Sequence, residues 1–167
     1  MSNTINDPLD DAIGKLKECI VADGYYSLQP PVTINDLQLR LSMASEDESL
    51  SADFLRSNSE YRRFLTTMNG VEFEGLVLYG VSDSDHPNSA GINIFTINKE
   101  NSNNPIYADQ NITDKVQVGH LSPCIYLYNP ETRMFEERDE IGTDYVSAEF
   151  DSLSTLILHL LGRLNIA

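Results

Sequence analysis

Two aspartates, Asp83 and Asp85, have the clearest potential for chemistry, and they lie in the polar segment SDSDHPN at residues 82–88. Aspartates at this spacing are the first two ligands of an EF-hand calcium loop. Such a loop also needs glycine at its sixth position and a bidentate glutamate at its twelfth. Asn88 and Ile94 stand at those positions, so the sequence predicts a polar turn between two strands and no metal ion.

The sequence contains no recognisable catalytic combination of residues either. The three histidines, His86, His120 and His159, are far apart, and no phosphate loop, nucleophile elbow or zinc pattern occurs. Cys124 lies in an apolar segment without a recognisable base, which favours packing over nucleophilic attack. His159 falls outside the apolar stripe of the last helical segment, which predicts a solvated position. We therefore predict neither an enzyme nor a cofactor.

The charge of the chain is its most informative property. It has 26 acidic and 11 basic residues, a net charge of −15 and an isoelectric point of about 4.3. Such a chain repels nucleic-acid phosphates and anionic membranes, and it attracts basic proteins. A need for solubility explains the same acidity, and the sequence leaves both interpretations open.

Three acidic clusters and one aromatic residue are candidates for binding a protein partner. The clusters precede the third helical segment, occupy the polar turn and flank the final hairpin, and each is also explained as a solvated surface. Tyr107 is the candidate anchor, because a few buried aromatic residues carry more binding energy than charges at a rim. The acidic candidates are Glu46, Asp47, Glu48, Asp53, Asp83, Asp85, Glu136, Glu137, Asp139 and Glu140.

The length of 167 residues fits one domain spanning residues 1–167. No apolar run approaches the roughly 20 residues that cross a bilayer, and residues 1–11 carry acids without lysine or arginine. These features predict a cytoplasmic location. Cys19 and Cys124 are too few for a disulfide framework and are predicted to be buried thiols.

Capping residues mark the first two helices. Asp7 caps a helix over residues 7–22, and Pro8 takes its first position, where a missing N–H has no cost. Thr33 caps the second helix. The acidic, serine-rich residues 45–51 are expected to be a linker.

The third predicted helix runs directly into a strand. Ser57 and Glu60 have the spacing of a capping box at its start. Asn69 and Gly70 tolerate positive φ and end it, and the apolar run at residues 76–81 predicts a buried strand. This helix cannot bury its apolar stripe alone, and packing on the face of a sheet would bury it.

The second half of the sequence predicts an antiparallel meander and a final helix. Strands are expected at residues 92–97, 116–118, 124–128 and 133–138, a type I turn joins the last two, and Asp151 or Ser152 caps the helix. The predicted core residues are Phe64, Leu65, Leu78, Leu156 and Leu160. The fold class is therefore α+β, with a central, mostly antiparallel β-sheet packed against N-terminal and C-terminal helices.

The order of these motifs resembles a known family. The stretch YRRFLTTMNG followed by FEGLVLYG is similar to the hallmark of the SUKH superfamily, and within it to the YrhA-like branch. The segments IYLYNPETRMFEERD and EFDSLSTLILHLL resemble the penultimate hairpin and the final helix of that branch. The resemblance covers about residues 5–164.

The resemblance implies an α+β domain without a catalytic motif. Many bacterial members are implied to be immunity proteins that bind and neutralise a toxin delivered by a neighbouring cell, and eukaryotic relatives are implied to be cell-wall and signalling regulators. The leading hypothesis is thus a non-catalytic protein that neutralises a basic toxin, such as a nuclease, by direct binding. The alternative is an intracellular scaffold or regulator on the same fold with no toxin partner, and a hydrolase with an unrecognised site is a third class.

Overall fold

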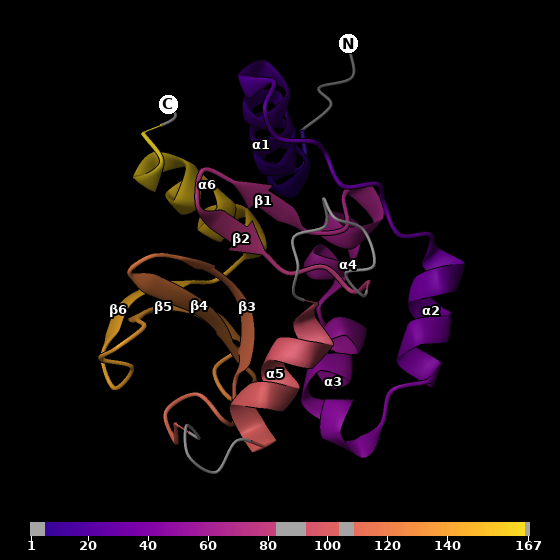
Figure 1. Cartoon of the computed structure of the whole chain (residues 1–167), viewed down its shortest axis with the longest axis vertical. Coiled ribbons are helices and arrows are strands. Elements are labelled where there is room, and N and C mark those ends of the chain that lie inside the picture. Colours follow the sequence, from indigo (N-terminus) through magenta and orange to yellow (C-terminus); the bar gives the residue numbers. More distant parts are fainter. Residues whose placement is uncertain (1–5, 83–92, 104–108, 166–167) are drawn as a thin grey trace.

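The computed structural model describes residues 6–82, 93–103 and 109–165, and it shows an α+β fold (Figure 1). The helices of these residues are α1 (Pro8–Asp23), α2 (Ile34–Ser42), the 3₁₀ helix η1 (Glu46–Glu48), α3 (Ser49–Ser57), α4 (Ser59–Thr67), α5 (Ile94–Asn103) and α6 (Leu153–Arg163). The strands are β1 (Val71–Phe73), β2 (Leu76–Leu78), β3 (Val116–Leu121), β4 (Cys124–Asn129), β5 (Met134–Asp139) and β6 (Val146–Phe150).

The described strands form one sheet in the order β1-β2-β3-β4-β5-β6, and every neighbouring pair is antiparallel. Strands adjacent in sequence are thus adjacent in the sheet, including β2 and β3, whose long connection contains α5. Helix α1 packs against α6. Helices α3 and α5 pack against β3, where the sheet curves (Figure 1). The predicted fold class, an antiparallel sheet packed against N-terminal and C-terminal helices, is confirmed.

One large hydrophobic core joins the helices to the sheet. The five predicted core residues are each at most 1% exposed, which confirms the helix registers: Phe64, Leu65, Leu78, Leu156 and Leu160. Burying an apolar side chain of this size contributes about 1.5–3 kcal/mol. None of the described helices is both long enough and apolar enough to cross a membrane.

Asn69 and Gly70 form the junction between α4 and the sheet. Gly70 has φ of 88°, which confirms the predicted left-handed conformation. A Cβ atom on Gly70 would lie 2.8 Å from Gly80 N and 2.9 Å from Leu78 O. Asn69 Oδ1 accepts a hydrogen bond of 2.9 Å from the N–H of Val81. The residues that follow α4, which ends at Thr67, are therefore tied to the chain that leaves β2.

Three of the predicted helix caps are confirmed. The side chains of Asp7, Thr33 and Ser152 accept hydrogen bonds from N–H groups in the first turns of α1, α2 and α6. The capping box predicted at the start of α4 is wrong, because Ser57 is the last residue of α3. Asn58 caps α4 through its side-chain oxygen at 2.9 Å. Asparagine is as good a cap as serine, and here it lets α4 follow α3 with no linker.

Two segments fold differently from their prediction. The strand expected at residues 92–97 is wrong, because residues 94–97 belong to α5 and Asn93 forms only an isolated bridge with Gly80. Its buried residues Ile94, Phe95 and Asn98 follow helical spacing. In a short apolar run, this spacing cannot be distinguished from the alternation of a strand. The linker expected at residues 45–51 is also wrong, because it forms η1 and the start of α3.

The hairpins agree better with the sequence. Strands β4 and β5 pair as predicted, around the turn at residues 129–132. The strand expected at residues 76–81 is shorter, since β2 ends at Leu78, and β1 precedes it. Glu74 and Gly75 both have positive φ, as a tight two-residue hairpin turn between β1 and β2 requires.

Candidate partner-binding site

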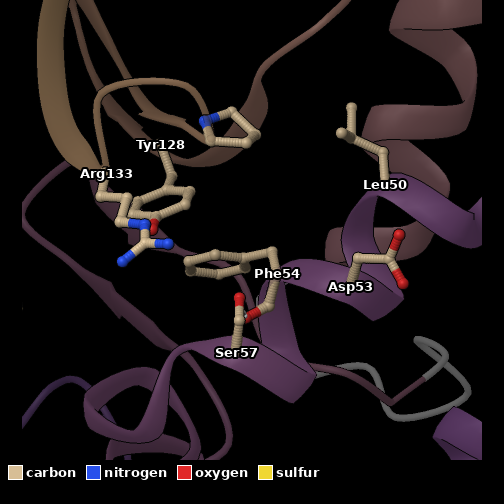
Figure 2. Close-up of a pocket in the computed structure, with 7 residues that line it drawn as sticks. Leu50, Asp53, Phe54, Ser57, Tyr128 and Arg133 are labelled. Atoms are coloured by element: carbon tan, nitrogen blue, oxygen red, sulfur yellow. Dashed lines mark hydrogen bonds between the residues drawn. The ribbon is translucent and has the colours of Figure 1, made fainter.

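An open pocket of about 460 Å³ lies between α3 and the turn that joins β4 to β5 (Figure 2). Pockets of this size commonly receive ligands or side chains. The sequence candidates include only one of its lining residues, Asp53. The lining residues are Leu50, Asp53, Phe54, Ser57, Tyr128, Pro130 and Arg133.

Two aromatic side chains form the floor of the pocket. The ring centroids of Phe54 and Tyr128 are 4.8 Å apart, and Phe54 also packs edge-on against Tyr61 at 5.2 Å. Phe54 and Tyr128 are 2% and 8% exposed, so the core holds both rings in place. The pocket thus offers a rigid apolar surface, which is typical of the positions where a partner inserts a side chain.

The rim of the pocket carries both signs of charge. Figure 2 shows Asp53 and Arg133 to either side of Phe54. Asp53 pairs with Arg56 at 3.2 Å, but both side chains are at least half exposed, and such surface pairs contribute little. Arg133 forms no ion pair or side-chain hydrogen bond with any residue that the structure describes. Both charges are therefore available to a partner.

The first acidic cluster is only partly available. Glu46 and Asp47 are exposed in η1. Glu48 is half-buried, and Arg40 Nη2 donates to its Oε2 at 2.5 Å, a hydrogen bond that lowers the pKa of Glu48. The Arg40 guanidinium also lies over the Phe95 ring, 3.8 Å from its centroid. Glu48 thus ties η1 to α2 and α5, and Glu46 and Asp47 remain as candidates.

The expectation that Glu136 and Glu137 lie at the surface is wrong. They are 2% and 8% exposed in β5, and as neighbours on a strand they face opposite sides of the sheet. Glu136 Oε2 accepts hydrogen bonds of 2.9 and 2.8 Å from Arg138, whose Nη1 donates to Thr143 O at 2.6 Å. This buried pair holds the β5–β6 connection and leaves neither charge for a partner.

On the other face, Glu137 is the centre of a polar network beneath α6. Its Oε2 lies 2.8 Å from Tyr126 OH and 2.6 Å from His159 Nε2, and its Oε1 accepts from Ser147 Oγ at 2.9 Å. Burial raises the pKa of Glu137, but its hydrogen bonds, that with His159 foremost, outweigh burial and hold the pKa below its ordinary value. His159, predicted to be solvated, is instead half-buried against the sheet.

Because of Glu137, the free energy of unfolding is expected to decrease as the pH falls into the acid range. Its pKa is lower in the folded chain than in the unfolded one, so its contribution is present above about pH 4.5 and is lost as the pH falls through the folded value. We expect Glu137→Gln to lower the free energy of unfolding by about 2 kcal/mol near neutral pH. Below about pH 5, the free energy of unfolding of the variant should also fall less steeply with decreasing pH than that of the wild type.

Urea denaturation at a series of pH values measures both effects. Glu149→Gln is the matched control, because Glu149 is an exposed residue of the neighbouring strand β6. Identical pH slopes for wild type and Glu137→Gln would show that the Glu137 network contributes no acid sensitivity.

The end of the third acidic cluster shapes a loop. Asp139 Oδ1 accepts hydrogen bonds from the N–H groups of Gly142 and Ile141 at 3.0 and 2.8 Å, and these lower the pKa of Asp139. Glu140 is exposed and accepts from Ser122 Oγ at 3.2 Å. Three further candidates lie outside the described residues, namely Asp83, Asp85 and Tyr107.

The thiols and the possible metal ligands form no reactive site among the described residues. Cys19 and Cys124 are free and half-buried, and burial, together with nearby Glu137, raises the pKa of the Cys124 thiol. A thiol with a raised pKa is a poor nucleophile, which suits packing. Within the described part of the chain, no group of three or more histidine, cysteine or carboxylate side chains could hold a metal ion.

Most of the basic side chains are occupied by contacts within the chain, which the sequence alone did not indicate. Arg62, for example, donates hydrogen bonds to Leu55 O and Arg56 O, and Arg163 donates to Tyr126 OH. The occupied bases are Arg40, Arg56, Arg62, Arg63, Lys115, Arg138 and Arg163. The bases without a side-chain partner among the described residues are Lys15, Lys17, Lys99 and Arg133.

The sequence could not have indicated the pocket, because its two walls are more than seventy positions apart in the chain. The resemblance to the SUKH superfamily depends on the sequence motifs alone. Comparison of the chain with protein-family models, with curated proteins and with solved structures gave no match.

Proposed function

We propose that this chain is a non-catalytic binding protein of the SUKH type, which neutralises a basic bacterial toxin by binding it directly. The distribution of charge is the observation that carries the proposal. Acids greatly outnumber bases, and most bases are held in contacts within the chain. The surface therefore keeps a large excess of exposed acids, which attracts a basic partner over long distances.

A nuclease toxin is the kind of partner that this surface fits best. Nucleases need basic surfaces to hold phosphate groups. An acidic protein can occupy such a surface, and complementary charge raises the rate at which the two proteins associate. Direct occupation of the basic surface would block the toxin without any chemical step.

The pocket supplies the apolar part of the proposed interface. Phe54 and Tyr128 give it a rigid floor, and Asp53 stands at its rim. Glu46 and Asp47 lie in η1, which leads directly into α3. An aromatic or aliphatic side chain of the toxin would enter the pocket, while the acids contact basic residues around it.

Asp53→Lys is the variant that tests this placement. We expect it to slow association with the toxin domain encoded beside the gene by about tenfold at low salt, with a much smaller effect at high salt. Glu18→Lys is the control, because it makes the same change of charge at an exposed position on α1. Stopped-flow or surface-plasmon measurements at several salt concentrations give the rates.

Equal effects of the two variants would show that only the net charge matters and that the pocket is not the interface. Co-expression of the chain with the neighbouring toxin domain tests the function itself, with survival and complex formation as readouts. If neither survival nor complex formation is observed, or if no toxin gene lies beside this one, the alternative of an intracellular scaffold or regulator is favoured.

A further inference from the structure

The outer edge of β6 is a free edge of the sheet. Strand β6 is the last in the strand order and pairs with β5 along one side only. Along its other side, the backbone groups of residues 146–150 form no hydrogen bond with any residue that the structure describes. Figure 1 shows β6 at the outer margin of the sheet. Such an edge can pair with a strand from another protein.

Strand β6 lacks two of the features that block pairing at an edge. Its sequence, VSAEF, contains no proline and no lysine. The register shift in its pairing with β5 lies at the Val146 end, and from Ala148 to Phe150 the ladder is regular. The opposite edge of the sheet, β1, has only three residues. With five residues against three, β6 is the longer of the two edges.

Two exposed apolar side chains lie directly before β6. Ile141 is 91% exposed and Tyr145 is 69% exposed in the β5–β6 connection. Asp139 fixes the start of this connection through the N–H groups of Ile141 and Gly142. The backbone at Ile141 is thus held in place, and both apolar side chains remain exposed to a partner.

The charge beside the edge identifies the occupant. Residues 139–162 contain no lysine or arginine. The exposed acids in this segment are Asp139, Glu140, Asp144, Glu149 and Asp151. A second copy of the chain would bring the same acids against this edge, and facing like charges oppose pairing. We infer that the free edge of β6 docks an extended, basic segment of a protein partner as an added strand.

This inference deepens the proposed function and rests on it for the identity of the basic partner. Main-chain hydrogen bonds to β6 give affinity, and lysine or arginine at alternate positions of the added strand faces Glu149 and its neighbours. Ile141 and Tyr145 contact apolar side chains at one end of the segment.

Amide hydrogen exchange, followed by NMR on the full chain, tests strand addition directly. The probe is a short blocked peptide of alternating lysine and valine. We expect it to slow exchange of alternate amides in residues 146–150 by about tenfold or more. A glutamate–valine peptide, or the lysine–valine peptide with N-methylated amides along one edge, should leave these amides unchanged. Binding of the lysine–valine peptide without protection of β6 would overturn the inference.

Matched variants distinguish edge docking from general attraction. We expect Glu149→Lys to weaken peptide binding about tenfold. Glu72→Lys, an equal change on the exposed face of β1, should weaken it less than about twofold. Equal weakening by the two variants would contradict docking at β6.

The toxin domain, the peptide and the Glu149→Lys variant together distinguish this inference from the proposed function. If the neighbouring toxin domain does not bind, but the peptide still protects β6, the toxin proposal fails and the docking edge stands. If the toxin binds wild type and Glu149→Lys equally well, and β6 amides exchange as in the free chain, the docking edge is wrong and the toxin proposal stands.

Discussion

Replacing Phe64 with alanine is expected to lower the free energy of unfolding by about 3–5 kcal/mol. The side chain is 0% exposed on α4, and its ring packs against Tyr61 with centroids 5.3 Å apart. Alanine would leave a cavity in the large core that joins the helices to the sheet, and the close packing of this core limits collapse. Urea denaturation at neutral pH measures the change.

Thr67→Ala is the control for this experiment. Thr67 is exposed on the same helix, and its hydroxyl donates only to Arg63 O at 2.9 Å. We expect this variant to change stability by less than about 1 kcal/mol. If Phe64→Ala were as stable as Thr67→Ala, the packing of α4 on the sheet would be wrong.

Gly70→Ala should destabilise the chain by about 3 kcal/mol or more, because two costs combine. Positive φ costs a residue with a Cβ atom about 1–2 kcal/mol. The new Cβ would also lie 2.8 Å from Gly80 N and 2.9 Å from Leu78 O, so the backbone that leaves β2 must shift. The free energy of unfolding and the melting temperature both report this loss.

Gly75 offers a control that separates the two costs. It also has positive φ, 84°, but a Cβ there would meet nothing nearer than a Leu121 methyl group at 3.9 Å. Gly75→Ala should therefore cost only about 1–2 kcal/mol, for the backbone conformation alone. Equal losses for Gly70→Ala and Gly75→Ala would mean that the close approach of the backbones at Gly70 contributes nothing.

The parts of the fold that could be predicted are those with a strong local signal. Asp7 and Ser152 cap helices through contacts within one turn, and Gly70 adopts the positive φ that its type favours. The helix α4 itself ends earlier than predicted, at Thr67, with Met68 extended. The error at residues 92–97 has a different cause. A short apolar run fits both periodicities, and contacts of Ile94 and Phe95 with distant elements select the helix.

The candidate site was harder to predict because it depends on distant contacts. Glu136 and Glu137 look like a surface cluster, but one pairs with Arg138 on the same strand face and the other meets His159 from α6. The spacing of Glu136 and Arg138, two apart on a strand, was a usable signal for the first pair. No local pattern indicates the second.

The occupation of so many arginines by internal contacts also determines how this chain responds to dissolved ions. A folded chain with net charge −15 repels itself, and seven of its eleven lysines and arginines contact other groups of the described chain. Salt screens exposed charges beyond about 8 Å at physiological ionic strength, whereas the buried pair of Glu136 and Arg138 is screened much less. Dissolved cations thus supply part of the charge compensation that surface lysines and arginines provide in most proteins.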